Sequence, residues 1–196
     1  SGNTAVGYNS LVSNTTGATN VAVGAFALDA NTTADTNTAV GASSLGSNTT
    51  GDGNTSVGKD SMRLNTTGRV AAALGVNALY SHTTGLFNVG VGKDAGFGIT
   101  SGSYNTALGG QTLFASNTAS NNTAVGYAAL SNSTANNNTA VGYYALRLNT
   151  TGNSNVAVGR EALTANTTGA NNCAFGKDVL LTNTTGTTNV AVGNFS

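Results

Sequence analysis

The sequence predicts an all-β fold, a parallel β-solenoid of about eleven coils with 17 residues each. Three observations support this prediction. The pentapeptide Asn-Thr-Ala-Val-Gly and its variants recur every 17 residues, except for one unit of 16 that begins at Asn122. Each unit holds two short apolar segments and a polar turn, too little chain for a helix-containing repeat. The repetition covers the whole chain, so we expect one solenoid domain over residues 1–196.

A short strand opens each unit at positions 1 to 5, with Asn at position 1 in eleven of twelve units and Ala71 as the exception. Neighbouring residues of a strand point to opposite faces. Position 4 is always Val, Leu or Phe, and we expect it to face the core together with position 2. Position 3 is Ala in ten of twelve units, with Ser56 and Gly90 as the exceptions. A row of such small residues suggests close approach by another surface, so we expect the Ala row, including Ala124, to face a neighbouring chain.

A glycine ends each strand at position 5, as expected where a chain turns with positive φ or passes close to another backbone. These corner glycines are the predicted structural repeat residues: Gly7, Gly24, Gly41, Gly58, Gly75, Gly92, Gly109, Gly126, Gly142, Gly159, Gly176 and Gly193.

The second apolar segment follows the corner and carries Leu or Met at position 9 in ten of eleven full units. This column is the second predicted part of the core. A polar Asn-Thr-Thr-Gly turn then closes the unit, and the Asn at position 1 is expected to form a ladder of stacked amides along the axis. Since one coil encloses only two or three apolar side chains, we expect burial against sister chains in a homo-oligomer, most simply a homotrimeric rod.

Segments such as 20–24 (Asn-Val-Ala-Val-Gly) and 155–159 resemble the repeats in the heads of trimeric autotransporter adhesins. Longer stretches, such as 3–17 and 138–152, are similar to repeats of bacteriophage tail fibres that carry an endosialidase-type C-terminal chaperone. The resemblance implies an extracellular trimeric fibre, on a virion or a bacterial surface, and a chain that is a segment of a longer fibre. The period is longer than that of the adhesin heads, and no chaperone-like domain is recognised.

Composition and motifs exclude several function classes. Seven basic and seven acidic residues leave no surface suited to nucleic acid, and no apolar stretch approaches the roughly 18 residues needed for membrane insertion. The four pairs of adjacent opposite charges at 59–60, 93–94, 160–161 and 177–178 are expected to be solvated ion pairs. We therefore predict no enzyme, no catalytic residue, no metal site and no cofactor.

Two single residues and one motif are open to other interpretations. Cys173, the only cysteine, is expected to be a small buried thiol, and His82, the only histidine, is expected to replace Asn within a ladder. Seven Asn-Thr-Thr runs fit the N-glycosylation pattern, although Asn and Thr are also common turn residues.

Two surfaces are candidates for binding. Tyr80, Phe87, Phe97, Tyr104 and Phe114 cluster where the repeat is least regular; they form an aromatic belt for sugar rings or a neighbouring fibre, unless Phe97 fills the core beside Gly96. The Thr-Thr rows form a second array, resembling that of ice-binding solenoids, which is interrupted at Ser101, at Ala119 and in unit 122–137.

The expected function is a structural segment of an extracellular fibre that positions or forms a receptor-binding surface, with a cell-surface glycan or receptor as a partner. The alternative is an ice- or glycan-binding solenoid.

Overall fold

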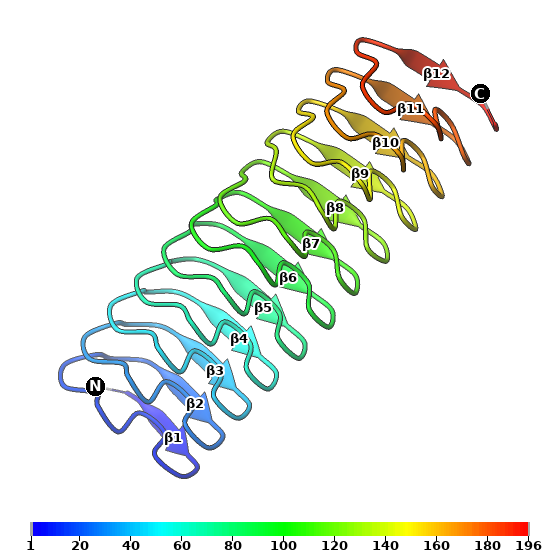
Figure 1. Ribbon diagram of the computed structural model, residues 1–196. Helices are drawn as coiled ribbons and strands as arrows, with labels where there is room; N and C mark the ends of the chain where they lie inside the picture. Colours follow the sequence, from blue (N-terminus) through cyan, green and yellow to red (C-terminus); the bar gives the residue numbers. More distant parts are fainter. Residues whose placement is uncertain (1, 196) are drawn as a thin grey trace.

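The structure is a computed structural model that describes residues 2–195, and it is a parallel β-solenoid (Figure 1). Twelve three-residue strands form one sheet in sequence order, and no helix occurs within the described residues. The strands are β1 (Thr4–Val6), β2 (Val21–Val23), β3 (Thr38–Val40), β4 (Thr55–Val57), β5 (Ala72–Leu74), β6 (Val89–Val91), β7 (Thr106–Leu108), β8 (Thr123–Val125), β9 (Thr139–Val141), β10 (Val156–Val158), β11 (Cys173–Phe175) and β12 (Val190–Val192). The predicted fold class is confirmed.

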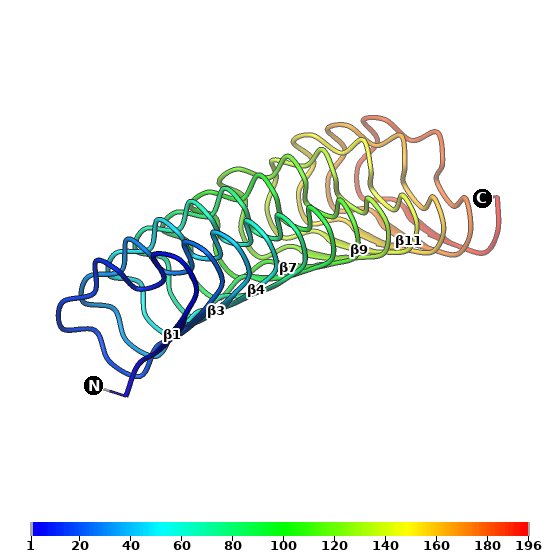
Figure 2. The same ribbon diagram turned by 90° about the horizontal axis from the view of Figure 1, so that it is seen from below.

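Each strand pairs in parallel with the strand of the next coil, and equivalent positions of the repeat lie opposite each other. Ala22 pairs with Ala39, for example, and the register is kept through the 16-residue unit, where Ala124 pairs with Ala140. At about 4.8 Å per coil, eleven steps give a rod about 50 Å long. The strands form one gently curved side of this rod, seen along the lower edge of Figure 2.

The core consists of three columns per coil: position 3 of the strand, the small residue at position 8, and Leu or Met at position 9. In coil 20–36 these are Ala22, Ala27 and Leu28, all fully buried. The prediction for the Leu column is confirmed. The prediction for the strand is wrong: the Ala row faces the core, whereas positions 2 and 4 face outward, as Leu74 and Phe175 do with about half of their surface exposed.

The width of the coil explains this inversion. The strand side of the interior lies directly against the Leu column, as shown at Gly90, where an added Cβ would already approach Leu79 Cγ to 2.8 Å. A methyl group is the largest side chain that most coils admit there, so the larger β-branched residues point outward. Ser56 replaces Ala in one coil, and its hydroxyl is satisfied in the core by Ser44 and by the carbonyl of Ser61.

The corner glycines adopt the predicted special conformation. Their φ angles lie between 120° and 138°, a region open only to glycine. Each corner also touches the next: a Cβ on Gly24 would lie 2.5 Å from the carbonyl oxygen of Gly41. Both predicted reasons for glycine, the turn and the close backbone approach, therefore apply at the same position.

Three further columns adopt the left-handed conformation without being glycine, which the sequence did not indicate. They are positions 7, 9 and 17, represented in one coil by Phe26, Leu28 and Thr36 with φ of 58°, 50° and 58°. Each coil thus reverses direction at several left-handed residues. The buried Leu column is itself one of them, because the reversal is what points its side chain inward.

Coil 88–104 lacks the Leu of position 9 and repairs its core in an unexpected way. Ile99, which stands in the Asn column of position 12, is fully buried and reaches the space beside Gly96. Leu79 from the preceding coil fills the rest of the space beside Gly96. A Cβ added to Gly96 would lie only 2.7 Å from Leu79 Cδ2. The expectation that Phe97 enters the core is wrong; its ring lies outside, between Tyr80 and Phe114.

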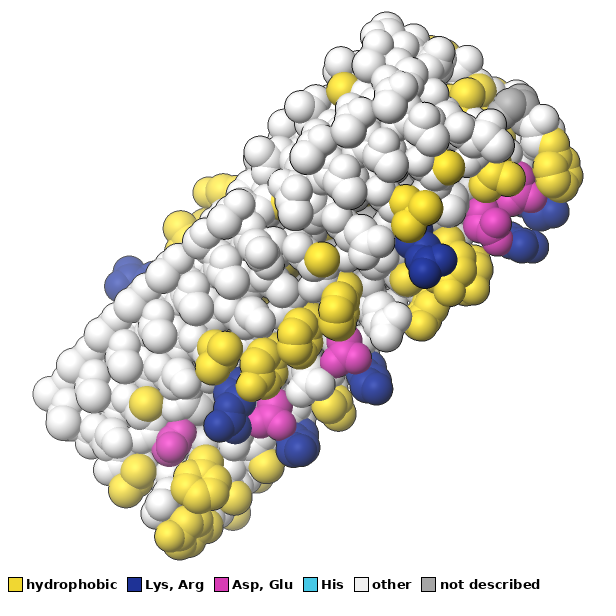
Figure 3. All heavy atoms as spheres, in the orientation of Figure 1, with side chains coloured by type: hydrophobic (Ala, Val, Ile, Leu, Met, Phe, Trp, Pro, Cys, Tyr) yellow, Lys and Arg dark blue, Asp and Glu magenta, His cyan; other side chains and the backbone are white. Residues whose placement is uncertain are grey.

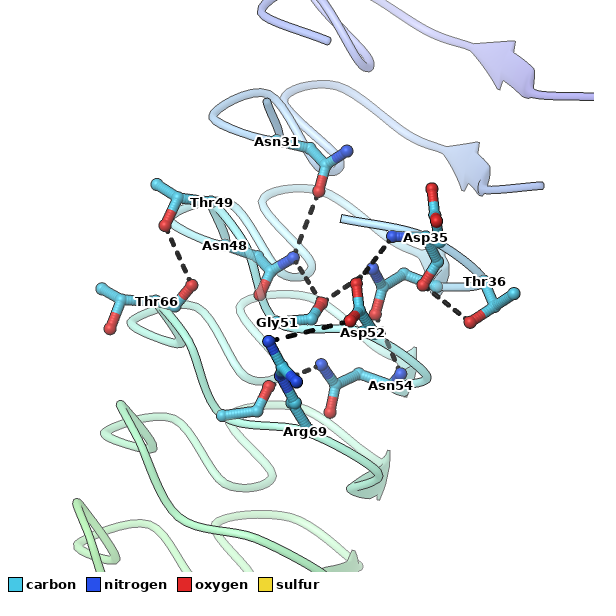
Figure 4. Close-up of polar contacts among 12 residues, drawn as sticks. Asn31, Asp35, Thr36, Asn48, Thr49, Gly51, Asp52, Asn54, Thr66 and Arg69 are labelled. Carbon is cyan, nitrogen blue, oxygen red and sulfur yellow. Dashed lines mark hydrogen bonds and ion pairs between the residues drawn. The ribbon is translucent and has the colours of Figure 1, made fainter. Parts of the chain in front are cut away.

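Two ladders of buried asparagines connect the coils. In the predicted ladder at position 1, the Asn20 side-chain oxygen accepts from the Asn37 backbone N–H (2.9 Å), and the Asn37 side-chain amide donates to the Gly51 carbonyl (2.9 Å). The second ladder, at position 12, joins side chains directly: Asn48 donates to Asn31 Oδ1 (3.2 Å) and to the Gly51 carbonyl (3.0 Å) (Figure 4). Most coils are therefore closed and tied to their neighbours by the same amides; the exceptions are Ala71 at position 1 and His82, Ile99, Ser116 and Ser133 at position 12.

Candidate binding surfaces

One regular surface is the outward face of the sheet, formed by positions 2 and 4 of the repeat in the twelve described strands. Its residues are mainly Thr and Val, and those of inner strands such as Thr139 and Val141 are half-buried by their neighbours within the same chain. The face carries no Lys, Arg, Asp or Glu from one end to the other. Such an uncharged, continuous array is unusual for a free surface.

Cys173 lies on this outward face, at position 2 of its repeat unit and as the first residue of β11, opposite Val156 and Val190 in the neighbouring strands. It is half-buried. The expectation of a buried thiol is wrong, because position 2 of the repeat faces outward and not toward the core. The residue instead provides a natural chemical probe of the sheet face.

The predicted aromatic belt divides into two stacks at different positions of the repeat. Tyr80, Phe97 and Phe114 occupy position 10 of successive coils, with ring centroids 5.1 Å apart and planes within 13° of parallel. Phe87 and Tyr104 form a separate pair at position 17, 5.4 Å apart. The five residues therefore do not form one continuous site.

Stacking limits what these aromatic rings can bind. A sugar packs on the face of a ring, and within each stack the inner faces are covered by the neighbouring rings, which leaves mainly edges exposed. Only the terminal rings of a stack keep an open face. A third cluster, Tyr127, Tyr143 and Tyr144, was missed because its members stand at ordinary corner positions.

Charged and apolar side chains gather along one flank of the rod, whereas most of the remaining surface in this view consists of backbone and of side chains that are neither charged nor hydrophobic (Figure 3). The four adjacent pairs bond within themselves, from Arg160–Glu161 at 2.8 Å to Lys93–Asp94 at 3.9 Å. Their basic ends are largely exposed, but their acidic side chains are only 8–25% exposed, and Asp178 Oδ1 is buried without a hydrogen-bond partner among residues 2–195. The pairs are therefore solvated at their basic ends only, and the expectation of fully solvated ion pairs is wrong for the carboxylates.

The Thr-Thr rows differ in their availability. In most coils the first Thr uses its hydroxyl within the stack, as Thr49 Oγ1 donates to the Thr66 carbonyl of the next coil (3.1 Å, Figure 4). The second Thr, for example Thr50, is exposed. The prediction that Ala119 interrupts the row of second threonines is wrong. The Asn117 carbonyl accepts from Thr100, which identifies Asn117 as the residue at the first Thr position of its coil. Thr118 therefore keeps the second Thr position, and the row of first threonines is the one interrupted here. The short unit lacks the second Thr after Thr134.

The Asn-Thr-Thr motifs do not expose their asparagines. The five inner ones are fully buried, and their amides are engaged in the second ladder: Asn31, Asn48, Asn65, Asn149 and Asn166. A glycan on any of these side chains is incompatible with the folded coil.

His82 occupies the second ladder in place of Asn, as predicted. Its Nδ1 lies 2.8 Å from Asn65 Oδ1, and its Nε2 lies 3.1 Å from Asn88 Nδ2. Because the Asn65 oxygen only accepts, Nδ1 carries the proton and Nε2 accepts from Asn88. Burial of the ring lowers the pKa of His82 to about 4, so the imidazole is neutral near pH 7.

Two acidic side chains also act as ladder members. Asp52 Oδ1 accepts from the Asp35 backbone N–H (2.9 Å, Figure 4), and Asp35 Oδ1 accepts from the Ala18 backbone N–H in the same way. Ser103 and Ser120 take this role in later coils. Within residues 2–195 no three His, Cys, Asp or Glu side chains lie close enough to hold a metal ion. The same range contains no helix of the length and apolarity that a bilayer crossing requires.

Comparison with known proteins adds no functional assignment: neither a protein-family model, nor a curated protein, nor a solved structure matches this chain.

Proposed function

We propose that this chain is a rigid segment of an extracellular fibre, a phage tail fibre or a bacterial surface adhesin, that assembles with copies of itself. The observation that carries the proposal is the uncharged Thr and Val face that runs over all twelve strands. A thin core made mostly of Ala and Leu stabilises a single chain weakly. Burying the sheet faces of several copies together adds the apolar contact that each chain lacks.

A threefold arrangement suits this face best. Three parallel rods with their sheets turned toward a common axis form a closed assembly in which every copy is equivalent. The charged and aromatic flank stays outside, where it keeps the fibre soluble. Such an assembly holds a receptor-binding region at a fixed distance from the particle or cell.

Solution mass tests the proposal directly. Light scattering combined with electron microscopy should give three times the chain mass and a slender rod. A stable monomer with the mass of one chain would overturn the proposed assembly.

Cys173 supplies a second test without any change to the sheet face. If the faces are closed against each other, maleimide should label Cys173 slowly in the native protein and rapidly in guanidinium chloride. The control is the double variant Cys173→Thr, Ser154→Cys, which moves the thiol to an exposed turn. This thiol should label rapidly in both conditions, and equally fast native labelling of Cys173 would argue against the interface.

The alternative function is binding of ice or glycan by the Thr rows. Its support is the exposed second Thr of most turns, such as Thr50 and Thr67. The rows are broken by the missing residue after Thr134, which divides the array. Thermal hysteresis of a dilute solution is the discriminating measurement: growth-arrested, faceted ice crystals with a monomeric protein would favour this function over the fibre.

A further inference from the structure

Position 10 forms a column of mostly large side chains along the charged flank, and Ser131 interrupts it. The preceding member is Phe114 and the following member is Arg147. Because Ser131 is small and nearly buried, it leaves a hollow of about 200 Å³ between these two larger residues. We refer to this hollow as the Ser131 slot.

The walls of the slot are a ring face and a guanidinium. One face of Phe114 is covered by Phe97, and the other is directed toward the coil of Ser131, where the stack ends. On the far side, the Arg147 guanidinium carbon lies 4.3 Å above the Tyr144 ring centroid, which holds it in place.

The spacing of the coils sets the width of the slot. Phe114 and Arg147 stand two coils apart, about 9.6 Å at about 4.8 Å per coil. A ring that took the place of a position-10 side chain in the coil of Ser131 would lie one coil, about 4.8 Å, from Phe114, within the range of ring stacking. The slot thus admits one six-membered ring, in the place that the next aromatic residue of the column would take.

The polar groups of the slot are mostly donors. No ion pair to Arg147 occurs within residues 2–195, and no carboxylate lines the slot. Tyr127 donates its hydroxyl to Gln111 Oε1 (2.9 Å), which leaves the Gln111 amide hydrogens as donors. Ser131 and Asn132 add a hydroxyl and an amide. This set favours an anionic and hydroxylated ligand.

A similar hollow at Gly46 shows what distinguishes the Ser131 slot. Gly46 interrupts the same column between Asp29 and Arg63, with Phe26 nearby. There, however, Arg63 is bound to Asp60 at 2.9 Å, and Asp29 adds a carboxylate to the lining. The Gly46 hollow lacks a free cation and repels an anion.

We propose that the Ser131 slot binds a single pyranose ring that carries a carboxylate, a hexuronic acid unit of an acidic glycan. The apolar face of the sugar packs on Phe114, its carboxylate pairs with Arg147, and its hydroxyls bond to Gln111, Ser131 and Asn132. The slot lies outside the sheet, so this binding depends neither on chain assembly nor on the Thr rows.

Saturation-transfer difference NMR with methyl β-D-glucuronide tests the proposal, with methyl β-D-glucopyranoside as the neutral probe. We expect saturable binding of the glucuronide in the millimolar range and at least about tenfold weaker binding of the glucoside, since a charge-assisted pair is lost. Equal binding of both sugars, or no saturable signal from the glucuronide, would overturn the proposal.

Two variants and one control locate the site. Ser131→Phe continues the aromatic column into the slot and should abolish the glucuronide signal, whereas Leu181→Phe, three coils further along the same column, should leave it unchanged. Arg147→Gln should weaken the glucuronide about tenfold without affecting the glucoside. If the glucuronide signal persisted in a Ser131→Phe chain whose circular dichroism matched that of the native chain, the binding would lie elsewhere and the assignment would be refuted.

Discussion

At the scale of single residues, the corner glycines are the least replaceable part of the repeat. Gly109 has φ of 124°, and a Cβ there would collide with the carbonyl oxygen of Gly126. We expect Gly109→Val to lower the free energy of unfolding by more than about 3 kcal/mol, from strain and collision together. Its neighbour Gly110 is the control, because a Cβ there meets only ordinary contacts beyond 3.4 Å. Thermal melting should show little change for Gly110→Ala, and an unchanged melting temperature for Gly109→Val would contradict the corner assignment.

Substitution of a left-handed residue at position 17 is expected to stabilise the fold rather than destabilise it. Thr36 is exposed with φ of 58°, a conformation that β-branched residues disfavour and Asn tolerates. Other coils carry Asn at this position, for example Asn121 and Asn171. We expect Thr36→Asn to stabilise the fold by about 0.5–1 kcal/mol, measured by chemical denaturation. Thr33→Asn, an exposed change outside the left-handed columns, should have no such effect; equal shifts for both would remove the backbone explanation.

The sequence predicted the residue-scale conformations only where glycine marks them. Gly24 and its equivalents stand out because no other residue fits there. Leu28 and Phe26 adopt positive φ without any such mark, because the solenoid imposes their conformation through hydrogen bonds to neighbouring coils. One coil considered alone contains no information on this constraint.

At the scale of the elements, the second ladder makes stability depend on pH through His82. Its pKa of about 4 in the folded chain lies below the value of about 6.5 in the unfolded chain. The folded state thus binds fewer protons, and its stability is complete above about pH 6.5 and falls as the pH drops toward 4. The loss amounts to about 3 kcal/mol at most. Protonation disrupts the ladder because Nε2 can then no longer accept from Asn88.

The matched variant His82→Asn restores the residue that most coils carry at this position. We expect denaturant unfolding at pH 7, 6, 5 and 4 to show a smaller loss of stability for His82→Asn than for the native chain. Burial raises the pKa of Asp29, which acts in the opposite direction near pH 4, but this contribution is common to both proteins and cancels in their difference. Parallel pH profiles would show that His82 does not carry the dependence.

The two ladders also show which element-scale features a sequence reveals. The ladder at position 1 was predicted because Asn recurs in front of an apolar strand. The Asn of the Asn-Thr-Thr turns was assigned to a polar turn, since Asn and Thr are typical there. Its burial becomes evident only when the coil closes and brings Asn48 against the carbonyl of Gly51. The aromatic stacks and the Ser131 slot depend on the same closure, because they join residues of different coils.

At the scale of the whole molecule, the fold was predictable and the inside of the coil was not. Strict alternation along the strand showed that positions 3 and 4 face opposite ways. It could not show which of them faces inward, because Ala and Val are both apolar. The usual preference for the larger side chain inside fails here, since the Leu column leaves room only for a methyl group beside it. The expected contact between chains therefore moves from the Ala row to the Thr and Val face.

Two neighbouring residues of β8 separate folding from assembly. Ala124 is fully buried, so Ala124→Phe should destabilise the coil itself by about 3 kcal/mol or more through overpacking. Val125 is half-buried on the outward face, and Val125→Glu leaves its carboxylate in water in a single chain but would bury it between copies in the proposed fibre. A buried, unpaired charge is costly, so Val125→Glu should dissociate the assembly while the circular dichroism spectrum keeps its β-sheet form.

Light scattering and thermal melting of both variants show whether each substitution affects assembly or folding. An assembly that survives Val125→Glu at native concentration would exclude the sheet face as the contact, whereas a monomeric but folded Val125→Glu chain would show that the rod forms first and the fibre is built from its outward face.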